Sequence, residues 1–113
     1  MKLVIPHMTA KLCYDETNVK WDVKKKAGVY LIFNDDMVIY VGKSINTQER
    51  ILAHLSFHGE TNRELYGEIT SCHKPFVQVV YEKDEEERSR LENIFYDYYY
   101  HPIHNKQRPD RFD

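Results

Sequence analysis

The chain has 113 residues, the usual size of one domain with one hydrophobic core, and is too short for two. A hydrophobic fraction of 42% that includes many aromatic residues excludes wholesale disorder. The formal net charge of -2 excludes a strongly basic protein, so a polyanionic partner would have to be met by a local basic surface.

The sequence carries no sign of a membrane segment. No run approaches the roughly 18 apolar residues of a membrane span, and the N-terminus lacks the apolar core and cleavage site of a signal peptide. We therefore expect a cytoplasmic protein without a membrane partner. Cys13 and Cys72 stand outside any CxxC pair. Two free structural thiols in a reducing compartment fit them better than a disulfide.

Acidic and basic residues are separated along the chain. Acidic residues concentrate in the run EKDEEE at 82–87. A local basic surface is therefore compatible with the small negative net charge. The basic residues around the first predicted hairpin, the helix after it and the tail are Lys24, Lys25, Lys26, Lys43, Arg50, Lys106, Arg108 and Arg111.

The first half of the chain predicts an arm followed by a hairpin. Residues 1–26 alternate only weakly between apolar and polar, which favours a short strand or arm. Residues 28–33 predict a strand, 34–36 supply the turn residues Asn-Asp-Asp, and 37–41 predict a second strand. Gly-Lys-Ser at 42–44 then breaks the pattern.

Two helices are expected next. Asn46 and Glu49 have the spacing of a capping box, which predicts a helix over 47–57, and a second helix is expected over 61–69. On a helical wheel, Arg50 and His54 share a face beside the apolar side of the first helix. That apolar side is formed by Ile51, Leu52 and Leu55.

The last part predicts a strand over 76–81 and a long helix. Asp84 is a good N-cap, and the helix would run to about Tyr100, before Pro102. Glu92 falls at the margin of the apolar stripe of this helix. A half-buried carboxylate needs a partner, which would be an arginine, a hydrogen-bond donor or a metal ion.

These elements predict an α/β (α+β) domain with a small, mostly antiparallel sheet of three strands flanked by helices. We expect residues 1–26 to form an N-terminal arm and residues 27–113 a single domain. The candidate site would lie on the exposed face of the sheet, between the first helix and the helix that carries Glu92.

Four short stretches resemble the GIY-YIG nuclease family. They are "GVY" (28–30), "YVG" (40–42), "GKSINTQERILAHL" and "LENIFYDYYYHPIHN", and the resemblance covers roughly residues 27–106. Any one of them would be weak evidence, but their order and spacing together are specific. The polar positions of the family are filled by Tyr30, Tyr40, Lys43, Arg50, His54, Glu92 and Asn105.

The resemblance implies a divalent-metal-dependent DNA endonuclease. Glu92 would hold one ion, Mg2+ or Mn2+. Water molecules and a phosphate oxygen would be the other ligands of that ion. Arg50 would donate to the scissile phosphate. Tyr30 and Tyr40 would position or deprotonate the attacking water, with Lys43 lowering the cost of a phenolate, and which tyrosine is the base stays open.

The remaining positions have supporting roles by the same resemblance. His54 would contact the phosphate or carry a proton beside Arg50, and Asn105 would brace the site. Lys43, Arg50, His54 and Lys106 would contact nucleic acid. Domains of this family usually borrow specificity from an appended DNA-binding module. This chain would act non-specifically, dimerise to cut both strands, or be delivered to DNA by a protein partner.

Simpler interpretations stay open for each residue alone. The two tyrosines would be ordinary strand aromatics, Arg50 and His54 a solvated helix face, and Glu92 the partner of Arg88 or Arg90. The same fold would then be a catalytically silent module that binds nucleic acid or protein. A zinc site built on Cys72 and the histidines His58, His73, His101 and His104 is disfavoured, because no paired ligand spacing supports it.

Overall fold

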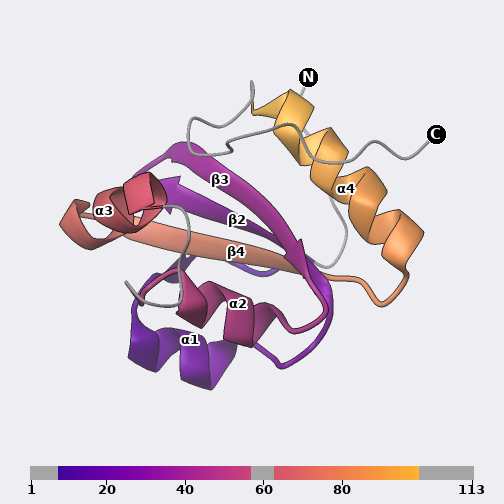
Figure 1. Cartoon of the computed structure of the whole chain (residues 1–113), viewed down its shortest axis with the longest axis horizontal. Helices are drawn as coiled ribbons and strands as arrows, with labels where there is room; N and C mark the ends of the chain where they lie inside the picture. The colour runs from indigo at the N-terminus through magenta and orange to yellow at the C-terminus, as the bar shows by residue number, and fades with distance from the viewer. Residues whose placement is uncertain (1–7, 57–62, 100–113) are drawn as a thin grey trace.

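The computed structural model describes residues 8–56 and 63–99 (Figure 1). Four strands form one antiparallel sheet in the order β1-β4-β2-β3. The strands are β1 (Leu12–Cys13), β2 (Gly28–Asn34), β3 (Met37–Ser44) and β4 (Pro75–Tyr81), and the helices are α1 (Glu16–Asp22), α2 (Thr47–Ala53), α3 (Arg63–Ser71) and α4 (Glu85–Tyr98).

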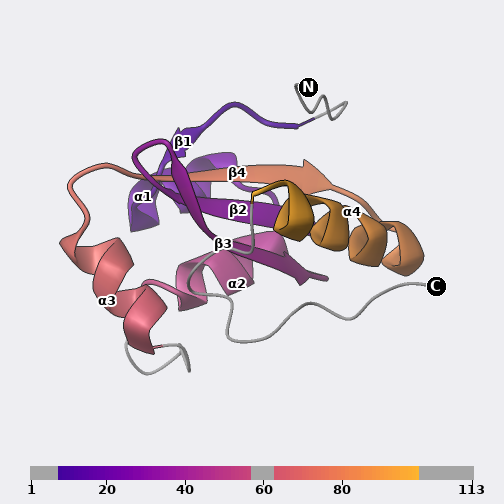
Figure 2. The same cartoon turned by 90° about the horizontal axis from the view of Figure 1, so that it is seen from above.

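The sheet lies between two layers of helices, with α4 on one face and α1 and α2 on the other (Figures 1 and 2). Ile32 and Val79 belong to the core under α1, α2 and α3, whereas Leu31 and Val41 pack with Phe95 of α4. Helices cover both faces, so β2 reads as a continuous apolar run. This architecture confirms the predicted fold class, and β1 is a short strand beyond the three expected.

The β2–β3 hairpin has the predicted turn. Its two loop residues are Asp35 and Asp36, and Asp35 has a φ of 55°. Among non-glycine residues, aspartate and asparagine enter this left-handed region most readily, and two-residue hairpin loops require it. The register also shifts between Ile32 and Phe33. The hairpin therefore twists between its turn and its open end.

The predicted break at 42–44 is wrong, because β3 continues to Ser44. Gly42 lies opposite Tyr30 and Lys43 opposite Val29 in the ladder. A Cβ atom on Gly42 would come within 2.5 Å of the Tyr30 ring. Glycine thus lets the strand run on beneath a phenol ring, since backbone pairing needs no side chain.

Both predicted N-caps are confirmed. The Asn46 side chain accepts a hydrogen bond from the Glu49 amide at 3.1 Å, and Asp84 accepts one from the Glu87 amide at 2.9 Å. Helix α2 ends earlier than predicted, at Ala53. The reason is a tightened last turn, in which amides bond to carbonyls three residues earlier.

The other helix and strand limits differ from the predictions by one or two residues. Helix α3 is described from Arg63 and ends two residues later than predicted, and β4 begins one residue earlier. Helix α4 is described to Tyr98, while residues 57–62 and 100–113, with Gly59 and Pro102, lie outside the described residues. None of the helices in the described ranges is long and apolar enough to cross a membrane.

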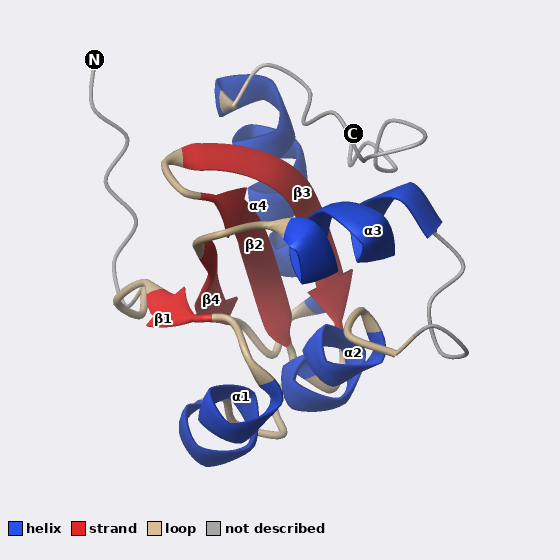
Figure 3. Cartoon of the chain, turned by 90° about the vertical axis from the view of Figure 1, so that its left-hand side faces the viewer, coloured by secondary structure: helices blue, strands red, loops and turns tan. Residues whose placement is uncertain are grey.

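The segment before residue 27 contains a helix that its sequence did not predict. Helix α1 begins after Asp15, which accepts a hydrogen bond from the Asn18 amide, and it lies beside α2 (Figure 3). Val19 and Tyr14 are buried in the same core as the sheet. The helix has only seven residues, so packing rather than periodicity stabilises it. The domain boundary after residue 26 stays a prediction.

Candidate active site

A buried pair of neutral groups lies at the centre of the site. The Tyr30 hydroxyl and Nε2 of His54 are 2.7 Å apart, and the two side chains are only 1% and 0% exposed. Burial, with a further contribution from Arg50, lowers the pKa of His54 to about 3. Burial likewise raises the pKa of Tyr30 well above its ordinary value. Both groups are therefore uncharged at neutral pH.

The simpler interpretation of His54 as part of a solvated helix face is wrong, because the residue is 0% exposed. His54 is the C-cap residue of α2, where the tightened last turn redirects the chain, and its ring packs against two tyrosines. Its ring centroid is 5.6 Å from that of Tyr30 and 5.1 Å from that of Tyr40. This part of the site lies inside the protein, between the sheet and α2, rather than on an open sheet face.

Tyr40 is the half-buried member of the tyrosine pair. It lies opposite Ile32 in the ladder, on the same face as Tyr30, with the two rings 6.2 Å apart. The Arg50 side chain donates a hydrogen bond to its hydroxyl. Burial raises the pKa of Tyr40, Arg50 lowers it, and the charge of Glu92 raises it again. A guanidinium and a carboxylate therefore both act on this phenol.

Lys43 and Glu92 form the charged side of the site. Because Lys43 is opposite Val29, which packs under α4, its side chain lies on the α4 side of the sheet. Its Nζ donates to Oγ of Ser89 at 2.7 Å and lies 4.0 Å from Oε1 of Glu92. Glu92 is 8% exposed. A carboxylate this buried needs a nearby positive charge, which Lys43 supplies.

The arginines of α4 have other contacts. Arg88 donates to the backbone carbonyls of Glu82 and Lys83 at 3.1 and 2.8 Å. Arg90 forms an ion pair with Glu87 at 2.7 Å on the exposed side of the helix. The interaction of Glu92 with Lys43 thus joins α4 to β3, the strand that also carries Tyr40. A pairing of Glu92 with Arg88 would stay within α4.

The side chains present fit a single hard divalent cation. Within the described ranges, no three His, Cys, Asp or Glu side chains gather as the closed shell of a structural zinc ion would require. Mg2+ in proteins is commonly held by one or two carboxylates, with water and substrate phosphate as the other ligands. Glu92 suits that role. The thiol of Cys72 donates instead to Oδ1 of Asn34 at 2.9 Å.

The structure brings most of the predicted site residues together at one edge of the sheet. They come from β2, β3, α2 and α4, where β3 is the edge strand. Asn105 and Lys106 lie outside the described residues. The residues of the cluster are Tyr30, Tyr40, Lys43, Arg50, His54 and Glu92.

Sequence reasoning missed two supporting residues. Ser89 precedes Glu92 by one helical turn, so the i, i+3 spacing would have placed both on one face of α4. The Tyr14 hydroxyl donates to the Ile51 carbonyl at 2.5 Å and so fixes α2 beside the site. No local pattern marks Tyr14, because its partner is 37 residues away.

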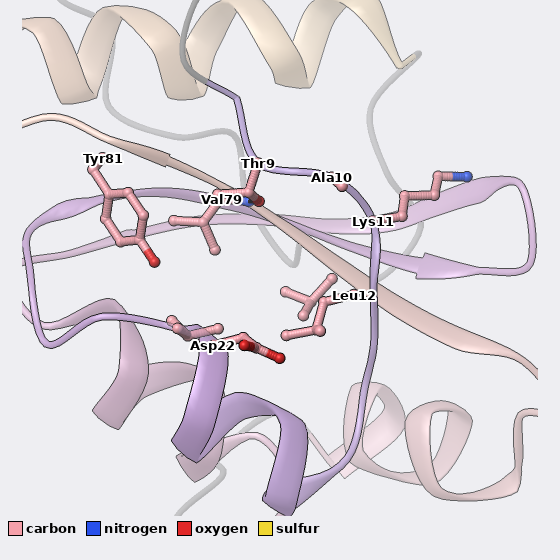
Figure 4. A pocket seen from close by; sticks show the side chains of 9 residues that line it. Thr9, Ala10, Lys11, Leu12, Asp22, Val79 and Tyr81 are labelled. Atoms are coloured by element: carbon pink, nitrogen blue, oxygen red, sulfur yellow. Dashed lines mark hydrogen bonds between the residues drawn. The ribbon is translucent and has the colours of Figure 1, made fainter.

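A separate cavity of about 230 Å3 opens at the other edge of the sheet, beside β1 and the end of α1 (Figure 4). Thr9, Leu12, Asp22, Val79 and Tyr81 are among the residues that line it. None of the predicted site residues within 8–56 and 63–99 does. The cavity is therefore distinct from the candidate active site.

Comparison with known proteins identifies one family. The family model described as the GIY-YIG catalytic domain matches residues 26–99. The UvrABC system protein C of Thermosipho africanus (strain TCF52B) is 32% identical over 77 residues, which are 68% of this chain. The chain spans only 13% of that relative's length.

Solved structures with the same fold come from the GIY-YIG N-terminal endonuclease domain of UvrC from Thermotoga maritima. The magnesium-bound domain is 19% identical, with a TM-score of 0.61 over 77% of this chain and 94% of that one. A tyrosine-to-phenylalanine point mutant bound to its catalytic divalent cation has a TM-score of 0.62 at 18% identity, over 79% and 96%. At these identities the likeness shows the fold. Since the family model matches most of the chain, and both tripeptides meet in one cluster, the protein belongs to the GIY-YIG family.

Proposed function

We propose that this protein is a divalent-metal-dependent endonuclease that hydrolyses phosphodiester bonds in DNA. The observation that carries the proposal is that Arg50 donates a hydrogen bond to Tyr40 while the charge of Glu92, on helix α4, acts on the same phenol. Phosphodiester cleavage needs a donor for the phosphate oxygens, an oriented nucleophile and a ligand for a charge-neutralising ion. Arginine, tyrosine and glutamate supply these three functions.

Arg50 and Lys43 would bind the substrate phosphate. A guanidinium has five N–H donors, enough for Arg50 to bond both Tyr40 and a phosphate oxygen. Lys43 reaches the same edge of the sheet and adds a positive charge beside Glu92. A Mg2+ or Mn2+ ion held by Glu92 would neutralise phosphate charge and lower the pKa of a bound water.

The two tyrosines would divide their work according to burial. Tyr40 is half-buried and would orient the attacking water with its hydroxyl, whereas Tyr30 is 1% exposed and would act through its contacts. His54 is 0% exposed and electrically neutral at pH 7, so a direct phosphate contact does not fit it in this conformation. We propose instead that His54 holds Tyr30, and through the ring contacts Tyr40, in position.

A plasmid-nicking assay tests this function. Supercoiled plasmid is incubated with the protein in Mg2+, in Mn2+ or in EDTA, beside the variants Glu92→Ala and Glu92→Gln. Glu85→Ala, which removes an exposed carboxylate from the first turn of the same helix, is the matched control. We expect metal-dependent nicking by the unaltered protein and the control, and none by either Glu92 variant.

Other results would point elsewhere. Nicking that persists in EDTA or in Glu92→Ala would contradict the assigned metal ligand. Metal-independent DNA binding without cutting would identify a catalytically silent binding module on the same fold.

We also propose a cytoplasmic location. The protein would either be targeted to DNA by a protein partner or cut as a homodimer. Sedimentation of the protein with and without DNA separates these two. A dimer that forms on DNA would favour paired cutting of both strands. A monomer at all concentrations that still nicks would favour non-specific action or delivery by a partner.

A further inference from the structure

We propose that a groove beside the active site binds the phosphate backbone of the DNA strand that is cut. This inference rests on the proposed function and names where its substrate continues beyond the reacting phosphate. The groove has a volume of about 630 Å3. Its walls, here called the lysine groove, include Lys25, Lys26, Ile45, Tyr81, Glu82 and Lys83.

The lysine groove lies at the same end of the sheet as the active site. Gly28 at the start of β2 pairs with Ser44 on one side and Tyr81 on the other, and the groove residues adjoin these three positions. Ile45 is two residues beyond Lys43, about 7 Å along an extended chain. A strand whose phosphate reached Lys43 would therefore meet the groove within a few nucleotides.

The loop that carries the groove lysines is held firmly. Thr47, which is 0% exposed, donates its hydroxyl to the carbonyls of Lys24 and Lys26 at 3.1 and 2.9 Å. Its amide also donates to the Lys26 carbonyl at 2.9 Å. On the other side, the Tyr81 hydroxyl accepts from the Lys24 amide at 2.8 Å. A fixed backbone lowers the entropic cost of binding, because only side chains must be ordered.

The residues that line the groove carry a positive balance of charge, and the remaining acids of the run 82–87 follow at the start of α4. Lys25, Lys26 and Lys83 are exposed and come from two separate segments, whereas Glu82 is the acidic member. The Glu82 carboxylate accepts from the Asp84 amide at 2.9 Å and so faces the start of α4. Lysines are point charges that bind phosphate without reading bases, so this contact would be independent of sequence.

The apolar part of the groove fits the same occupant. Ile45 is 79% exposed, and it follows directly on the strand that carries Lys43. A sugar-phosphate backbone presents phosphates and apolar sugar edges in alternation. The groove offers both kinds of contact, next to a site that would act on that backbone.

Salt-dependent binding of a short labelled DNA duplex in EDTA tests the proposal, because no cutting is expected there. The test variant is Lys26→Ala with Lys83→Ala. The control is Lys11→Ala with Lys74→Ala, which also removes two exposed lysines but at the hairpin-turn end of the sheet. For the test variant we expect on the order of tenfold weaker binding at low salt and a salt slope smaller by about 1.8. The control should match the unaltered protein.

The outcomes separate this inference from the proposed function. Equal affinity and salt slope for the two double variants would overturn the lysine groove while plasmid nicking still stood. Loss of binding in the groove variant, in a protein that shows no Glu92-dependent nicking, would support the groove and refute the nuclease. Absence of any DNA binding by the unaltered protein would overturn the groove directly.

Discussion

The two sides of the active site differ in the burial and charge of their side chains. On one side, Tyr30 and His54 are fully buried, neutral and bonded to each other. On the other, charged side, Arg50 of α2 and Lys43 of the edge strand β3 are half-buried, and Glu92 of α4 lies beside Lys43. The buried side cannot touch a substrate in this conformation, so it positions groups. The charged side is where a phosphate and an ion would bind.

The comparison predicts the largest effect at Arg50. Replacing it with alanine removes a donor to the phosphate and the bond to Tyr40, and we expect the nicking rate to fall by about 100-fold to 1000-fold. Arg50→Lys should recover little, because lysine lacks the planar fork. Arg90→Ala, on the exposed side of α4, is the control. A parental rate for Arg50→Ala would refute the assignment of the charged side.

Removing each tyrosine hydroxyl should separate the two sides. Tyr30→Phe takes away the partner of a buried imidazole nitrogen, so we expect a loss of about 1 to 3 kcal/mol in the free energy of unfolding. Tyr40→Phe should lower the nicking rate with a smaller loss of stability, because its hydroxyl lies in the half-buried part. Urea unfolding and single-turnover nicking measure the two. Equal losses of stability in Tyr30→Phe and Tyr40→Phe would contradict the division into a buried and a charged side.

The buried side should also make stability depend on pH. The unfolded chain binds a proton at His54 near the ordinary pKa of 6.5, whereas burial in the folded state lowers that pKa to about 3. Stability is therefore full above about pH 6.5 and is lost as the pH falls toward 3. Between about pH 7 and pH 5 the loss is about 2 kcal/mol. Urea midpoints should show it in the unaltered protein and in His73→Gln, an exposed control, and less in His54→Gln.

The smallest effect concerns Trp21, the single tryptophan of the chain. It is 83% exposed on α1, four residues before Lys25 of the lysine groove. DNA in the groove should change its fluorescence intensity modestly, without altering stability. The change should saturate at the DNA concentrations that saturate the labelled duplex. An unchanged emission at saturation would place the DNA away from this end of the sheet.

Local chemistry made much of the fold predictable. The Asn-Asp-Asp turn and the N-caps Asn46 and Asp84 depend on side chains that bond or bend the nearby backbone, so they are visible in short windows. Helix α1 was missed because its stability comes from packing Val19 into a distant core. Propensity within seven residues cannot report such a contact.

The candidate site was predictable in membership and less so in geometry. The order of residues gave Tyr30, Tyr40, Arg50 and Glu92, because family motifs preserve the chemistry they need. The burial of His54 was not visible, since it depends on where α2 tightens and on aromatic rings from other strands. A helical wheel assumes an unbroken helix and places the residue by angle alone.

Gly42 connects the two tripeptides of the motif in space. The tyrosine of "GVY" and the glycine of "YVG" are far apart in the printed sequence, yet any side chain at position 42 would collide with the Tyr30 ring. The two tripeptides therefore each supply one partner of the same contact, Tyr30 and Gly42. In an evolving lineage, Gly42 is not free to change while Tyr30 is present. A substitution at 42 becomes tolerable only in a background where position 30 has already become smaller, so the order in which mutations arise is itself constrained.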